Sequence, residues 1–192
     1  MDDLLDRWRA VLAEADDLEV RPPATEEAVA AFEARRGIEL PADYRRFVLE
    51  VADGILADGE PALYGVVDLE ADLAGDGDPA APFPYGDADA AALLAAMAAV
   101  PAGRGVLADP AVMALQRPGQ PDGCLTLTFG DGNAFSALVV TGEQRGRMWR
   151  TGEVDSPEVG ALYGGGDLTP LGFLDWLAPW ASDLLGLELD DA

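Results

Sequence analysis

Hydrophobic residues in the first part of the chain recur every three or four positions, which is the spacing of amphipathic helices. The pattern predicts a first helix over residues 3–18, which the prolines of segment 21–23 bring to an end. A second helix is predicted to begin after Thr25, a favourable N-cap residue, and to run to about Arg36. It ends at Gly37, because glycine readily takes the left-handed conformation that follows a helix.

A third helix is predicted to begin at Leu40-Pro41 and to end at Asp53-Gly54. Its buried face consists of Tyr44, Phe47, Val48 and Val51. The run 63–67 is of the β type and predicts a short strand. Asp68 follows this run and is placed to cap a small helical turn at 69–73.

Glycine, proline and aspartate interrupt the middle of the chain. Residues 74–87 predict a loop, and an alanine-rich helix is expected over about 88–99. Residues 101–122 are broken again, with Val106-Leu107 and 112–115 as candidate short elements.

The second half has the alternation and the turn residues of strands. Strands are predicted at 124–129, 134–141 and 147–150, and 130–133 is a strong turn signal between the first two. Strands joined by tight turns form an antiparallel meander. A closing helix follows at about 170–185. The order of elements predicts a single α+β domain over residues 1–192, with N-terminal helices, a central antiparallel sheet and a C-terminal helix.

The residue types that the chain lacks exclude much of enzyme chemistry. The chain has no His, all twelve basic residues are Arg, and Cys124 is the only cysteine. Histidine-dependent nucleophiles, zinc sites built on histidine, Schiff bases and a P-loop lysine are therefore excluded. Carboxylate chemistry and hard cations remain, so a carboxylate-dependent hydrolase or a calcium-binding protein stays open as a third class. Residues 72–78 do not have the spacing of an EF-hand loop, and we expect no metal site and no cofactor.

Three tryptophans and the cysteine are candidates for a ligand pocket or for the core. Trp176 and Trp180 have helical spacing and Trp149 lies in a predicted strand, which favours core packing over a pocket. Cys124 stands at the start of a strand and is predicted to be an inert buried thiol.

The charge of the chain is unusual. Acidic residues outnumber basic ones by 36 to 12, which gives a net charge of −24. Between Phe47 and Gly103 there are eleven acidic residues and no basic one. This acidity either keeps the chain soluble, as in an acidic proteome, or forms a docking face for a basic protein. Repulsion by the phosphates excludes direct binding to nucleic acid.

The sequence also bears on location. The N-terminus has no signal-peptide character, and the longest apolar run, 90–100, is far shorter than the roughly 20 residues that span a bilayer. With a single thiol as well, we expect a cytoplasmic protein that does not bind membranes.

Several segments together resemble one family, the SUKH superfamily of fungal cell-wall-assembly regulators and their bacterial relatives. The closest likeness runs from Leu40-Pro41 through Asp43, Tyr44, Arg45 and Phe47 to Asp53-Gly54, where the family usually has Asn-Gly. Further similar segments are 31–38, 63–69, 129–132, 138–142, 146–149 and 173–177. The resemblance covers about residues 26–180, and segment 74–122 is longer than in a minimal member.

The resemblance implies an α+β fold and a protein-binding role without catalysis. Bacterial members are similar to immunity proteins that neutralise polymorphic toxins, often nucleases, in the cytoplasm. We therefore expect a cognate toxin, a basic protein, as the partner, attracted by an acidic face. The alternative is a regulatory or scaffold domain without a toxin partner. The resemblance also leaves a homodimer open.

The predicted partner-binding residues are acids of the basic-free window, because its loops are the natural place for partner-specific contacts. They are Asp68, Glu70, Asp72, Asp76, Asp78, Asp87 and Asp89. No catalytic residue is predicted.

Overall fold

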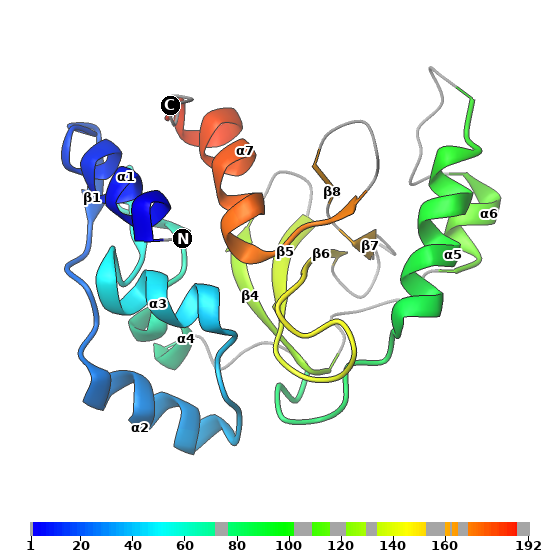
Figure 1. Ribbon diagram of the computed structural model, residues 1–192, viewed down its shortest axis with the longest axis horizontal. Helices are drawn as coiled ribbons and strands as arrows, with labels where there is room; N and C mark the ends of the chain where they lie inside the picture. Colours follow the sequence, from blue (N-terminus) through cyan, green and yellow to red (C-terminus); the bar gives the residue numbers. More distant parts are fainter. Residues whose placement is uncertain are drawn as a thin grey trace.

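A computed structural model describes residues 2–71, 77–101, 109–115, 122–129, 134–152, 160–161, 163–164 and 169–187 (Figure 1). The helices are α1 (Asp2–Ala13), α2 (Glu26–Arg36), α3 (Ala42–Glu50), α4 (Val66–Ala71), α5 (Asp87–Ala98), α6 (Pro110–Met113) and α7 (Phe173–Leu185). The strands are β1 (Leu18–Val20), β2 (Ile55–Ala57), β3 (Glu60–Leu63), β4 (Cys124–Phe129), β5 (Ala134–Val139), β6 (Met148–Gly152), β7 (Gly160–Ala161), β8 (Tyr163–Gly164) and β9 (Thr169–Pro170). This order confirms the predicted α+β fold, with N-terminal helices, an antiparallel sheet and a C-terminal helix.

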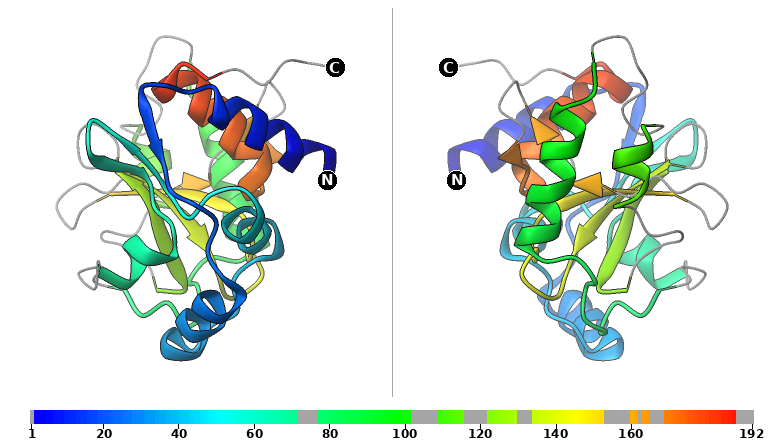
Figure 2. Two further views of the ribbon diagram at one scale, coloured as in Figure 1. Left: turned by 90° about the vertical axis from the view of Figure 1, so that its left-hand side faces the viewer. Right: turned by 90° about the vertical axis from the view of Figure 1, so that its right-hand side faces the viewer.

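The predicted meander is the centre of the molecule. Strands β4, β5 and β6 pair antiparallel in sequence order, and β7 extends the sheet. Because side chains alternate along a strand, Leu138 and Met148 enter one hydrophobic cluster, whereas Val139 and Trp149 enter another. The N-terminal helices and α7 lie on one side of the sheet, and α5 and α6 lie on the other (Figures 1 and 2). A sheet covered on both faces explains the continuous apolar run at 137–140.

The larger cluster connects the N-terminal helices to α7. Phe173 of α7 packs edge-on against Tyr44 and Phe47 of α3, with ring centroids 5.1 and 5.4 Å apart. Trp176 and Trp180 are buried and stack with centroids 5.3 Å apart. The helical spacing of the two tryptophans therefore correctly predicted core packing.

The smaller cluster lies between the sheet and α5. Trp149 is fully buried there, stacked on Tyr85 at 4.9 Å and edge-on to Phe83 at 5.0 Å. Cys124 belongs to the same cluster and is buried, as predicted. Trp149 is thus a core residue, like the two tryptophans of α7.

Capping residues correctly predicted several helix boundaries. The Thr25 hydroxyl accepts the N–H of Ala28 at 3.2 Å, and Gly37 ends α2 with a φ of 66°. The alanine-rich helix predicted over about 88–99 corresponds to α5 (Asp87–Ala98). The predicted turn at 130–133 and the candidate element Val106-Leu107 lie outside the described residues.

Two local predictions are wrong. The first helix ends at Ala13 and not at residue 18, because Leu18–Val20 forms strand β1, paired with β2. Val66 and Val67 begin helix α4 and do not end a strand, since β3 stops at Leu63. In both places, pairing or hydrogen bonding with distant residues outweighs the local pattern.

The small sheet of β1, β2 and β3 adjoins the central one. The N–H of Tyr64, just after β3, donates to the carbonyl oxygen of Leu127 in β4 at 2.8 Å. This contact places the start of α4 beside the central sheet. No helix formed by the described residues is both long and apolar enough to cross a membrane.

Candidate functional site

Two carboxylates fix the start of α4. Gly65 precedes the helix and has no side chain that could cap it, so Asp53 Oδ1 accepts the N–H of Val66 instead. Asp68, the third residue of the helix, accepts the Gly65 N–H through Oδ2 at 3.0 Å and pairs with Arg21 through Oδ1. Only 10% of the Asp68 side chain is exposed. The charge of this carboxylate is therefore balanced within the protein.

The contacts at the start of α4 shift the pKa values of two side chains, Asp53 and Arg21. Burial raises the pKa of Asp53, and hydrogen bonds from the N–H groups of Val66 and Val67 oppose that rise only in part. The hydrogen bond to Asp68 raises the pKa of Arg21, which stays charged. At the start of α4, two carboxylates, Asp53 and Asp68, therefore lie near one arginine, Arg21.

The start of α5 uses a similar arrangement. Gly86 precedes the helix, and Asp89, its third residue, accepts the Gly86 N–H at 2.8 Å. Glu143 accepts the N–H of Asp87 at 3.0 Å, and Gln144 donates its amide to Asp87 Oδ1 at 2.6 Å. All three carboxylates are exposed, and no arginine of the described residues pairs with them. Glu143 was not predicted as a site residue, because it lies far along the chain from α5.

The structure places five of the seven predicted partner-binding acids. They are Asp68, Glu70, Asp78, Asp87 and Asp89. Helices α4 and α5 lie well apart along the longest axis (Figure 1), so acids of the two helices form two groups and not one face. Asp78 lies in the loop before α5 and accepts the N–H of Ala80 at 2.9 Å. Asp72 and Asp76 lie outside the described residues.

The acids of α4 also differ from those of α5 in having arginine partners. Arg35 of α2 pairs with Glu70 at 2.6 Å, as Arg21 pairs with Asp68. Within the described part of the chain, no group of three or more His, Cys, Asp or Glu side chains is arranged to hold a metal ion. Of the predicted partner-binding acids that the structure describes, those without an arginine partner therefore lie on α5 and in the loop before it.

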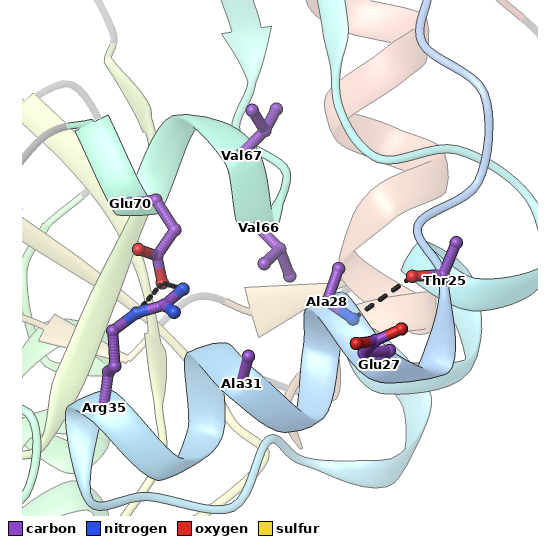
Figure 3. A pocket seen from close by; sticks show the side chains of 8 residues that line it. All are labelled: Thr25, Glu27, Ala28, Ala31, Arg35, Val66, Val67 and Glu70. Atoms are coloured by element: carbon purple, nitrogen blue, oxygen red, sulfur yellow. Dashed lines mark hydrogen bonds and ion pairs between the residues drawn. The ribbon is translucent and has the colours of Figure 1, made fainter.

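An open groove of about 400 Å³ separates α2 from α4 (Figure 3). Its lining residues are Thr25, Glu27, Ala28, Ala31, Arg35, Val66, Val67 and Glu70. Of these, only Glu70 is among the predicted partner-binding residues. The sequence signal for the others is the spacing of Ala28, Ala31 and Arg35, which places all three on one face of α2.

The two ends of this groove differ in charge. The Arg35–Glu70 ion pair closes one end, and Arg36 donates to the carbonyl oxygen of Leu69 beside it. At the other end, the exposed Glu27 forms no hydrogen bond or ion pair through its carboxylate with the described residues. Between the ends the lining is apolar.

These observations define an α+β protein with an antiparallel sheet, an open interhelical groove and two acidic groups at its surface. The sequence model of the SMI1 / KNR4 family (SUKH-1) matches residues 23–149, well over half of the chain, and the chain belongs to this family. The match includes α2, α3, α4 and the meander and ends within β6, so α7 lies beyond it. Comparison with curated proteins and with solved structures found no match.

Proposed function

We propose that this protein is a non-enzymatic, cytoplasmic immunity protein that neutralises a basic toxin by acidic-surface complementarity. The observation that carries the proposal is the acidity of the window from Phe47 to Gly103, which holds eleven acidic residues and no basic one. Membership of the SMI1 / KNR4 family (SUKH-1) is consistent with a protein-interaction role.

The start of α5 is an exposed part of this acidity, and Glu143 from outside the window adds to it. Asp87, Asp89 and Glu143 gather there around one helix end without an arginine partner among the described residues. Like charges held this close repel one another, and a cationic partner relieves the repulsion. A toxin that cleaves nucleic acid needs a basic surface to bind phosphates, so an acidic protein competes for that surface.

Electrostatic steering would raise the rate at which the immunity protein associates with the toxin. Electrostatic attraction raises association rates by roughly 10- to 1,000-fold at low salt. A fast encounter favours capture of the toxin before it reaches its substrate. The same attraction predicts that binding weakens as salt screens the charges.

The test compares two triple variants with equal changes in charge. Asp78→Asn, Asp87→Asn and Asp89→Asn together remove three negative charges, and the amide oxygens can still accept the same hydrogen bonds. The control removes three exposed charges on or near α1, by Asp3→Asn, Asp16→Asn and Asp17→Asn. We expect the first variant to bind the toxin domain encoded beside this gene about tenfold more weakly at low salt, with a shallower salt dependence, and the control to bind almost normally.

Three results would contradict the proposal. Equal effects of the two triple variants would mean that net charge acts without an acidic face. A gene with no toxin beside it, or a chain that fails to protect cells producing that toxin, would favour the regulatory or scaffold alternative.

A further inference from the structure

We propose that the groove between α2 and α4 is a socket for one short segment of a protein partner, with an apolar side chain in the groove and an adjacent Arg or Lys on Glu27. This inference rests on the proposed function for the existence of a protein partner. It adds the surface that is used and the chemistry of the segment that binds there.

The apolar part of the socket comes from both helices. Ala28 and Ala31 line it from α2, and Val66 and Val67 line it from α4 (Figure 3). Val67 is 49% exposed, although it is a large hydrophobic residue. Covering this surface with an apolar side chain removes it from water, which favours binding by about 25 cal/mol per Å².

The charges at the two ends give the socket a direction. Arg35 is already paired with Glu70, so this end offers little net charge to a ligand. Glu27 is exposed and has no ion pair with the described residues, so a partner's cation can bind at that end. A matching segment therefore carries an apolar residue next to a cationic one.

The net charge of −24 argues against a second copy of this chain as the occupant, because two such chains repel each other. It attracts a basic segment for the same reason. Charge complementarity thus selects the basic segment of another protein among the occupants that an apolar groove could take.

Both walls of the socket are held in place before anything binds. The Thr25 hydroxyl caps α2, and Arg36 connects the end of α2 to the Leu69 carbonyl oxygen of α4. Asp53 and Asp68 fix the start of α4. A pre-organised groove loses little conformational freedom on binding, which favours affinity for a short segment.

The first experiment titrates the full-length protein with a defined peptide and follows methyl chemical shifts. The probe is a capped Gly-Ser-Arg-Leu-Arg-Ser-Gly peptide, compared with one in which Ser replaces Leu. We expect the largest shifts at the methyl groups of Ala28, Ala31 and Val67, and about tenfold weaker binding of the serine peptide. Equal binding of both peptides, or shifts centred on the start of α5, would overturn the socket.

The second experiment uses variants matched in charge. Val67→Arg places a cation in the groove, whereas Met113→Arg adds the same charge at a residue that is similarly exposed, 45% against 49%. We expect Val67→Arg to weaken binding of the leucine peptide about tenfold, and Met113→Arg to change it less than about twofold. Glu27→Gln should weaken binding about threefold, and Glu14→Gln, an exposed control, should not. Equal effects of the two variants in either pair would overturn the inference. Self-association of the protein would also overturn it, if the Val67→Arg substitution abolished that self-association.

The socket and the immunity function can fail separately. A toxin that binds in a salt-dependent way, but equally well to the Val67→Arg variant, overturns the socket and leaves the immunity function standing. If the leucine peptide binds in the groove but this protein proves to have no toxin partner, the immunity function is overturned and the socket stands.

Discussion

Helices α4 and α5 begin in the same way. A glycine precedes each helix, and the third residue of the helix is an aspartate that accepts the N–H of that glycine. A carboxylate from elsewhere in the chain accepts the N–H of the first helical residue, Asp53 for α4 and Glu143 for α5. The two starts share a hydrogen-bonding pattern and differ in their surroundings.

The difference is burial and the presence of an arginine. Asp68 is 10% exposed and paired with Arg21, whereas Asp89 is exposed and has no arginine partner in the described part of the chain. A run of acidic residues in the sequence therefore does not by itself mark a binding face. The carboxylates of α4 are paired with arginines of the protein, whereas those at the start of α5 are exposed and have no arginine partner among the described residues.

The largest expected effect comes from filling the space at the two glycines. A Cβ at residue 65 would lie 2.2 Å from the Asp53 carbonyl group, so the backbone must move. A Cβ at residue 86 would meet the end of the Glu143 side chain at 2.5 Å, which can rotate away. We expect Gly65→Ala to lower the free energy of unfolding by about 3 kcal/mol or more, and Gly86→Ala by about 1 kcal/mol or less, measured by urea unfolding. Equal losses would mean that the two helix starts are equally constrained.

A smaller effect is expected from removing the aspartates themselves. Asp68→Ala leaves the Gly65 N–H without its acceptor and Arg21 without its ion pair, and should cost about 2 kcal/mol of folding stability. Asp89→Ala removes one exposed capping bond and should cost about 1 kcal/mol or less. Thermal unfolding of both variants measures this difference. An Asp89→Ala variant that loses as much stability as Asp68→Ala would contradict the distinction between the two helix starts.

The smallest effect concerns pH. Because burial raises the pKa of Asp53, the folded protein holds this proton more tightly than the unfolded chain does. Asp53 therefore favours folding at low pH, and this contribution is lost as the pH rises through its folded pKa. Asp53→Asn keeps an oxygen acceptor for the Val66 N–H and removes the charge.

We expect the stability of Asp53→Asn relative to the unaltered protein to be higher at pH 7.5 than at pH 5, by about 1 kcal/mol or less. Urea unfolding at the two pH values measures this, and subtracting the unaltered protein cancels the effect of its overall charge. A stability difference that does not change with pH would show that the buried charge of Asp53 has no effect on folding.

Local patterns predicted much of the fold. Thr25 and Gly37 bound α2 because capping depends on residues adjacent to the helix end. The strands of the meander follow from the alternation of apolar and polar residues along each segment. The resemblance around Leu40-Pro41 and Asp53-Gly54 correctly predicted the family. These residues lie just before and just after α3.

The failures occur where a distant group decides the local structure. Val66 and Val67 have the β-branched side chains of a strand, but Asp53 accepts the Val66 N–H and a helix begins there. Segment 18–20 continues the apolar spacing of the first helix, but pairing with β2 makes it a strand. Local propensity is weak compared with hydrogen bonds that burial makes obligatory.

The sequence alone determined the excess of negative charge, the missing catalytic residue types and most helices and strands. Only the tertiary structure decided which acids are balanced by an arginine of the described residues and which are not, and where α2 and α4 leave a groove. The physical reason is that charge balance and surface shape depend on distances between residues far apart in the chain. Arg21 and Asp68, or Arg35 and Glu70, become neighbours only when the chain folds.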